Sequence, residues 1–170
     1  VYVTGPSGAT ITGAANINNY AGVFIEGRNV TLSPYIMGKY EVTQQLYTAV
    51  MTNQTVTVGG TEKTLAASPF LCTETGTYPK ATTDIQILRP AENISWYDAC
   101  YFCNKLSEKM NLTPVYNITV KTVGTGSSAG HITSATVTIV ENANGYRLPT
   151  EAEWEFAARG GNPAVAAWNY

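Results

Sequence analysis

A stretch near the C-terminus, residues 145–161, constrains the fold of this chain most, because it encodes both ends of a helix. Thr150 is suited to the N-cap position, where its hydroxyl accepts a bond from a free backbone N–H of the first turn. Glu153, three residues later, can reach back to the N–H of Thr150, and the two residues make a capping box. Gly160 and Gly161 are typical of the turn that ends a helix. The sequence therefore predicts a short helix between Thr150 and these glycines.

The side chains of this predicted helix form an apolar stripe and a group of carboxylates, and the carboxylates can be interpreted in two ways. Trp154, Ala157 and Ala158 recur at helical spacing, and we expect them to form its buried stripe. Its first turns also hold three carboxylates, which could indicate a metal site or an acid/base pair. Their position at the positive end of the helix dipole favours capping and dipole roles instead. These carboxylates are Glu151, Glu153 and Glu155.

The same stretch carries a family resemblance. Residues 146–161, which read YRLPTEAEWEFAARGG, resemble the signature of the formylglycine-generating enzyme family, also called the sulfatase-modifying-factor domain. Residues 32–47 and 90–106 resemble two further segments of that family, in the family's order. Because the family continues well beyond this point, we expect residues 1–170 to be a single domain of this type that is truncated at its C-terminus.

The resemblance implies a fold and a set of cofactors. The implied fold is a variant of the C-type lectin fold: an α+β domain with mixed or antiparallel strands, about three short helices and much irregular structure. Family enzymes oxidise a cysteine of a sulfatase peptide to formylglycine with molecular oxygen and a copper(I) ion held by two cysteines of the C-terminal half. None of Cys72, Cys100 and Cys103 stands at a matching position. We therefore predict no catalytic, cofactor-binding or metal-binding residue in this chain, and we expect the copper and calcium sites that the family implies in a missing C-terminal part.

Two of the cysteines, Cys100 and Cys103, form a C-x-x-C pattern within a predicted helix. The pattern could indicate a redox pair or half of a metal site. A structural zinc site would need two more ligands, and His131 could supply only one of them. The apolar stripe of the helix favours a packing role for at least the second thiol. This stripe consists of Ala99, Phe102, Cys103 and Leu106. His131, as a lone histidine in a loop, is expected on the surface.

Composition limits the partners and the compartment. Charged residues make up 13% of the chain, about half of the usual share, and the net charge is −2. Without a basic cluster, nucleic acid is an improbable partner, because phosphate binding needs concentrated Lys and Arg. No apolar run reaches the ~18 residues of a membrane span. Because the chain opens at Val1 rather than Met, we expect that an upstream segment was removed. These features fit an exported protein of a bacterial cell surface or periplasm.

The N-terminal half is predicted to be strands followed by one helix and a loop. Residues 1–40 hold short apolar runs separated by glycines, which favours β-structure. Thr43 is expected to cap a helix whose apolar face is core. A Gly59–Gly60 turn predicts a hairpin, which we interpret as an insertion at about 53–66. Residues 66–90 show no periodicity and are predicted to be a long loop, where binding surfaces usually lie. The expected apolar face of the helix is Leu46, Tyr47, Val50 and Met51.

The second half begins with a central helix. Ser95 and Asp98 predict another capping box, and the helix should run to about Asn111. Residues 115–141 read as two alternating strands with a Gly/Ser-rich link, which is a second hairpin and a second expected insertion. Trp96 and Tyr97 are expected to pack rather than to form a ligand platform, and Arg147 to form a buried ion pair or to bind backbone.

Three functions stay open at this point. The favoured hypothesis is a non-catalytic ligand-binding or display domain, as in the variable proteins of diversity-generating retroelements, which belong to the same type. It would bind a protein or a small molecule through its C-terminal part. The alternative is the N-terminal part of a copper-dependent oxidase that generates formylglycine from a sulfatase cysteine. A purely structural surface protein is the third.

Overall fold

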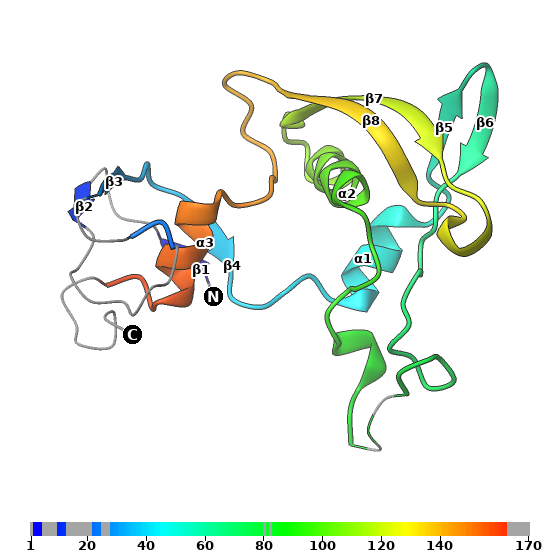
Figure 1. Cartoon of the computed structure of the whole chain (residues 1–170), viewed down its shortest axis with the longest axis horizontal. Coiled ribbons are helices and arrows are strands. Elements are labelled where there is room, and N and C mark those ends of the chain that lie inside the picture. Colours follow the sequence, from blue (N-terminus) through cyan, green and yellow to red (C-terminus); the bar gives the residue numbers. More distant parts are fainter. Residues whose placement is uncertain are drawn as a thin grey trace. The chain divides into compact units, whose positions relative to one another are not determined.

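The computed structural model divides the chain into two compact units. One, here the terminal unit, comprises Val1–Tyr40 and Pro149–Tyr170, and the other, the central unit, comprises Glu41–Leu148. Within them the structure describes residues 2–4, 10–12, 22–24, 28–79, 81 and 83–162 (Figure 1).

The terminal unit contains two antiparallel strand pairs. β1 (Tyr2–Thr4) pairs with β4 (Ile36–Gly38), and β2 (Thr10–Thr12) pairs with β3 (Asn29–Thr31). The prediction of β-structure for this part of the sequence is confirmed at these four strands. The apolar run at Val23 is an exception, since it forms a bend, and its end at Ile25 lies outside the described residues.

The third helix, α3 (Glu151–Ala158), begins and ends as predicted. The Thr150 hydroxyl accepts from the Glu153 N–H at 3.2 Å, and the Glu153 carboxylate accepts from the Thr150 N–H at 2.8 Å. Gly160 and Gly161 have φ values of +86° and +70°, a left-handed conformation that glycine adopts without a steric penalty. The capping box and the glycine stop are thus confirmed.

The predicted buried stripe of α3 is wrong. Trp154 is 61% exposed, Ala158 is exposed and Ala157 is half-buried, whereas Phe156 is 1% exposed. The reason is a tertiary contact, because the Phe156 ring packs against Phe24 with centroids 6.4 Å apart. The face opposite Trp154 therefore anchors the helix.

Among its described residues, the central unit holds two α-helices, two 3-10 helices and two hairpins. Figure 1 shows the long hairpin of β7 and β8 lying over α2. Each hairpin is a separate two-stranded antiparallel sheet. In chain order, the elements are α1 (Gln44–Met51), β5 (Thr55–Val58), β6 (Thr61–Thr64), the 3-10 helix η1 (Gln86–Leu88), α2 (Trp96–Lys109), β7 (Tyr116–Val123), the 3-10 helix η2 (Gly126–Ser128) and β8 (Ile132–Ile139).

Local sequence signals explain these elements. Thr43 caps α1, with its hydroxyl accepting from the Leu46 N–H at 3.2 Å. Ser95 and Asp98 form the predicted capping box of α2. Gly59 and Gly60 have positive φ values of 57° and 78°, which the tight turn of a two-residue hairpin requires. The predicted hairpins and helices are therefore confirmed. That the two hairpins are insertions stays a prediction.

The core of the central unit lies between α1, α2 and the hairpins. Tyr47 of α1 stacks on Phe102 of α2 with ring centroids 5.3 Å apart. Leu46, expected on the buried face of α1, is partly exposed. The buried residues of this core are Tyr47, Val50, Met51, Leu65, Phe102, Cys103 and Ile132. The fold is α+β, with three α-helices and short antiparallel strands among the described residues. None of these helices is both long and apolar enough to cross a membrane.

Candidate functional site

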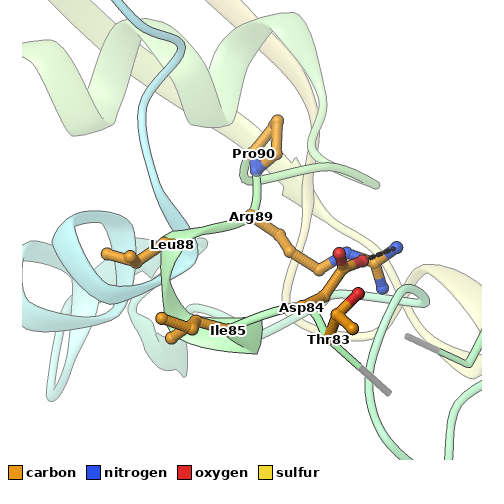
Figure 2. A pocket seen from close by; sticks show the side chains of 6 residues that line it. All are labelled: Thr83, Asp84, Ile85, Leu88, Arg89 and Pro90. Carbon is orange, nitrogen blue, oxygen red and sulfur yellow. Dashed lines mark ion pairs between the residues drawn. The ribbon is translucent and has the colours of Figure 1, made fainter. Parts of the chain in front are cut away.

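The loop between β6 and α2 carries an open pocket of about 480 Å³. One side of it is polar, with Thr83, Asp84 and Arg89, and the other is apolar. Figure 2 shows the Arg89 side chain reaching toward Asp84. The full lining is Thr83, Asp84, Ile85, Leu88, Arg89 and Pro90.

The guanidinium of Arg89 gives this pocket its chemistry. Its Nη2 lies 3.3 Å from the Asp84 carboxylate, whereas its Nη1 is buried and has no hydrogen-bond partner. A buried donor without an acceptor costs about 1–3 kcal/mol. A bound molecule with an oxygen acceptor would recover that cost once the side chain turned to meet it. The pocket is thus lined by a guanidinium that has one buried N–H group without an acceptor, beside apolar side chains.

Hydrogen bonds hold this loop on α1. The Arg89 carbonyl accepts from the Gln44 N–H at 2.8 Å, and the Val42 carbonyl accepts from the Ala91 N–H at 2.7 Å. Farther along the loop, the Glu92 carboxylate accepts from the Leu71 N–H at 2.6 Å. These bonds attach both the start and the end of the described part of the loop to the rest of the central unit.

Large apolar side chains stand on the same loop. Ile85, Ile87 and Leu88, on and beside η1, are each more than half exposed. Leu71 and Tyr78 of the loop are exposed too. We call Ile85, Ile87 and Leu88, which are neighbours in the sequence, the η1 patch. Exposed apolar side chains gathered on one loop are typical of a contact surface.

His131 is not the surface residue that the sequence predicted. Its side chain is 13% exposed, and its Nδ1 lies 2.7 Å from the Asp98 carboxylate. The other Asp98 oxygen accepts from the Ile132 N–H at 2.8 Å. The Ser95 hydroxyl donates to the Ile132 carbonyl at 2.8 Å rather than to the imidazole. This cluster therefore fastens the β7–β8 hairpin to the start of α2 and is not arranged as a Ser–His–Asp triad.

The C-x-x-C cysteines are both core residues, which the sequence predicted for Cys103. Cys100 and Cys103 are both buried on α2. Burial raises the pKa of the Cys100 thiol to about 11, although a hydrogen bond with Tyr116 lowers it, and burial raises the pKa of Cys103 to about 12. Copper(I) binds thiolates, so this buried, protonated pair does not fit the copper site that the family implies. Among the described residues, no group of three or more His, Cys, Asp or Glu side chains could hold a metal ion.

The carboxylates of α3 have structural roles. Glu153 is buried and completes the capping box. Glu155 accepts from Arg159 Nη2 at 2.6 Å and from the Val23 N–H. The contact with Val23 joins the helix to the N-terminal segment of the same unit, whereas the pair with Arg159 lies at the end of the helix itself. The expected capping role is confirmed for Glu153, whereas Glu155 does more than interact with the dipole.

Two other residues differ in part from their predicted roles. Arg147 is exposed, and its Nη1 donates to the Leu148 carbonyl at 3.0 Å, so the prediction of backbone binding is confirmed and that of burial is wrong. Trp96 packs edge-on against Tyr97 with centroids 5.4 Å apart, but it is largely exposed. At the first position of α2, part of its ring faces solvent.

Comparison with known proteins gives two curated relatives of interest. A chaperone protein, LppX, from Paenibacillus barcinonensis is 38% identical over 154 residues, which are 83% of this chain and 46% of that protein. The formylglycine-generating enzyme of Mycobacterium tuberculosis is 75% identical over 24 residues, which are 14% of this chain and 8% of the enzyme. The chain thus spans about half the length of the first of these relatives.

Solved structures and a family model support the same relationship. Treponema denticola variable protein 1 is 32% identical with a TM-score of 0.55, over 95% of this chain and 58% of that protein. The crystal structure of CarF is 26% identical with a TM-score of 0.61, over 99% of this chain and 60% of that one. The model of the sulfatase-modifying factor enzyme 1-like domain matches residues 3–169. The chain therefore belongs to the sulfatase-modifying factor enzyme 1-like family, with its variant of the C-type lectin fold.

Proposed function

We propose that this chain is part of a non-catalytic domain that binds a protein or small-molecule ligand on an exported bacterial protein. The observation that carries the proposal is the loop surface of the central unit. There, an open pocket with an unsatisfied Arg89 donor lies on the same loop as the η1 patch. Apolar walls with one or two polar groups are typical of ligand sites.

The chemistry of the thiols agrees with this proposal. Cys100 and Cys103 pack in the core, where burial raises the pKa of both thiols. Neither is in the state that binds copper(I) or attacks a substrate. The similarity to Treponema denticola variable protein 1 supports a binding role, with the ligand contacted by the loop surface and by residues outside this chain.

A second candidate is a copper-dependent oxidase that generates formylglycine from a sulfatase cysteine. The observation that favours it is the 75% identity over 24 residues to the Mycobacterium tuberculosis enzyme. In that case, the copper-binding cysteines would have to lie outside this chain.

A copper(I) titration of the natural protein separates the two candidates. The protein competes with a chelator of known affinity, and the Cys100→Ala/Cys103→Ala variant is measured beside it. We expect no tight binding from either protein. Tight binding that survives the double substitution would favour the oxidase and remove the proposal.

A further inference from the structure

The segment between β8 and α3 contains an Asn-Gly pair, Asn144–Gly145, and the sequence has no other such pair. In an Asn-Gly pair, the glycine nitrogen can attack the side-chain amide carbon of the asparagine, because glycine has no Cβ that hinders the approach. Asn144 is exposed to solvent. Among the described residues, the Gly145 N–H has no hydrogen-bond acceptor that the reaction would first have to displace. The pair is therefore open to deamidation, which converts an asparagine to an aspartate.

A backbone donor contacts the oxygen that gains charge in this reaction. The Thr113 N–H donates to Asn144 Oδ1 at 2.9 Å. When the glycine nitrogen adds to the amide carbon, negative charge develops on this oxygen, and a donor already in place stabilises that charge. Asn142 of the same segment is exposed too, but it precedes Ala143, and no donor reaches its side chain among the described residues. The two asparagines thus differ in both features that favour the reaction.

We propose that Asn144 is a site of spontaneous deamidation in the folded protein. The Gly145 nitrogen forms a bond to Cγ of Asn144, its proton passes to the amide nitrogen, and ammonia leaves as the bond between Cγ and Nδ2 breaks. The product is a cyclic succinimide. Water then opens this ring: cleavage of the new bond gives aspartate, and cleavage of the original peptide bond gives isoaspartate. One water is consumed and one ammonia is released, and no oxidant or cofactor takes part.

The isoaspartate product should disturb a closely packed part of the segment. Its main chain is one carbon longer between position 144 and Gly145. Even an added Cβ at Gly145 would clash with the Ser107 hydroxyl and the Thr113 carbonyl, so the backbone has no room to shift there. The next amide depends on the same hydroxyl, because the Tyr146 N–H donates to Ser107 Oγ at 2.8 Å. Formation of isoaspartate should therefore break this attachment of the segment to α2.

The test is to incubate the folded natural protein at mildly alkaline pH in water enriched in heavy oxygen. Base speeds the reaction, because the attacking nitrogen must lose its proton. Mass spectrometry of peptides then follows the change from amide to carboxylate at each asparagine. We expect Asn144 to convert several-fold faster than Asn142, to take up one heavy oxygen per conversion and to give both aspartate and isoaspartate. An Asn144 that keeps its amide in the folded protein, or that converts only after unfolding in urea, overturns the proposal.

The variant Ala143→Gly is the matched control for the backbone donor. It makes Asn142 part of a second Asn-Gly pair in the same segment, without a donor like the Thr113 N–H on its side chain. We expect Asn144 to remain the faster site in this variant. Equal rates at the two asparagines would refute the contribution of the Thr113 N–H.

Amide hydrogen exchange tests the structural consequence. The isoaspartate form is separated by chromatography and compared with the variant Asn144→Asp, which has the same added charge and an unchanged main chain. The Tyr146 amide should exchange faster in the isoaspartate form than in Asn144→Asp. The same exchange rate in both would show that the longer main chain does not release this amide. The proposal does not depend on the ligand-binding function.

Discussion

Replacing Asp98 with alanine should destabilise the central unit strongly. Its carboxylate is 2% exposed and accepts from the Ser95 N–H at 3.0 Å, from His131 at 2.7 Å and from the Ile132 N–H at 2.8 Å. The substitution leaves these donors without an acceptor and removes half of a capping box. From about 1–3 kcal/mol for each unsatisfied buried group, reduced because some donors will reach water, we expect a loss of about 3–5 kcal/mol.

The free energy of unfolding is measured by urea denaturation, with Glu108→Ala on the same helix as the control. Glu108 pairs with Lys105 at 2.8 Å on the surface, and an exposed pair contributes only about 0–1 kcal/mol. Amide exchange at Ile132 reports whether the hairpin loosens with Asp98→Ala. If both variants lost about the same free energy, within about 1 kcal/mol, the attachment of the hairpin would not depend on this carboxylate.

Three further predictions concern the core residues. An alkylating reagent should label the partly exposed Cys72 in the native protein, and Cys100 and Cys103 only after unfolding; rapid native labelling of the latter two would show that they are not core. Because burial raises the pKa of both thiols from 9.0 to about 11 and 12, their contribution to stability is complete below about pH 9 and is lost as the pH rises toward those values. The urea concentration at the unfolding midpoint should therefore decrease as the pH is raised above 9, and it should decrease less steeply in Cys103→Ala. An equally steep decrease in this variant would refute the ionisation of Cys103 as the cause. Phe156→Ala should lower the free energy of unfolding, measured by urea denaturation, by about 3–5 kcal/mol, and Trp154→Ala by less than about 1 kcal/mol. The reverse order would show that the face with Trp154 is the buried one, as the sequence predicted.

Local signals predict the helix ends and the tight turn correctly. The capping boxes at Ser95 and Thr150 involve residues three positions apart, so the sequence alone carries the geometry. The Gly59–Gly60 turn and the burial of Cys103 are predictable for similar reasons, from backbone freedom and helical spacing.

Contacts between distant segments are not predictable in this way. The sequence places Asp98 in its capping box, but the bond of Asp98 to His131 joins residues 33 positions apart. A lone histidine in a loop gives no sign of such a partner. Likewise, α3 offers both Trp154 and Phe156 for burial, and the position of distant apolar residues such as Phe24 and Leu32 decides between them.

The pocket is predictable from the sequence only as a loop surface. Neither Arg89 nor Asp84 belongs to a motif, and their pairing depends on the path of the chain between β6 and α2. The single weak signal is a charged residue beside apolar side chains in a segment without periodicity.

The most direct test of the proposed function is to incubate the natural protein with copper(I), oxygen and a peptide that contains the cysteine of a sulfatase. Mass spectrometry then shows whether that cysteine becomes formylglycine, with the Mycobacterium tuberculosis enzyme as the positive control. A non-catalytic binding domain predicts an unchanged peptide. Conversion of the cysteine by the natural protein would contradict the proposed function and establish the oxidase.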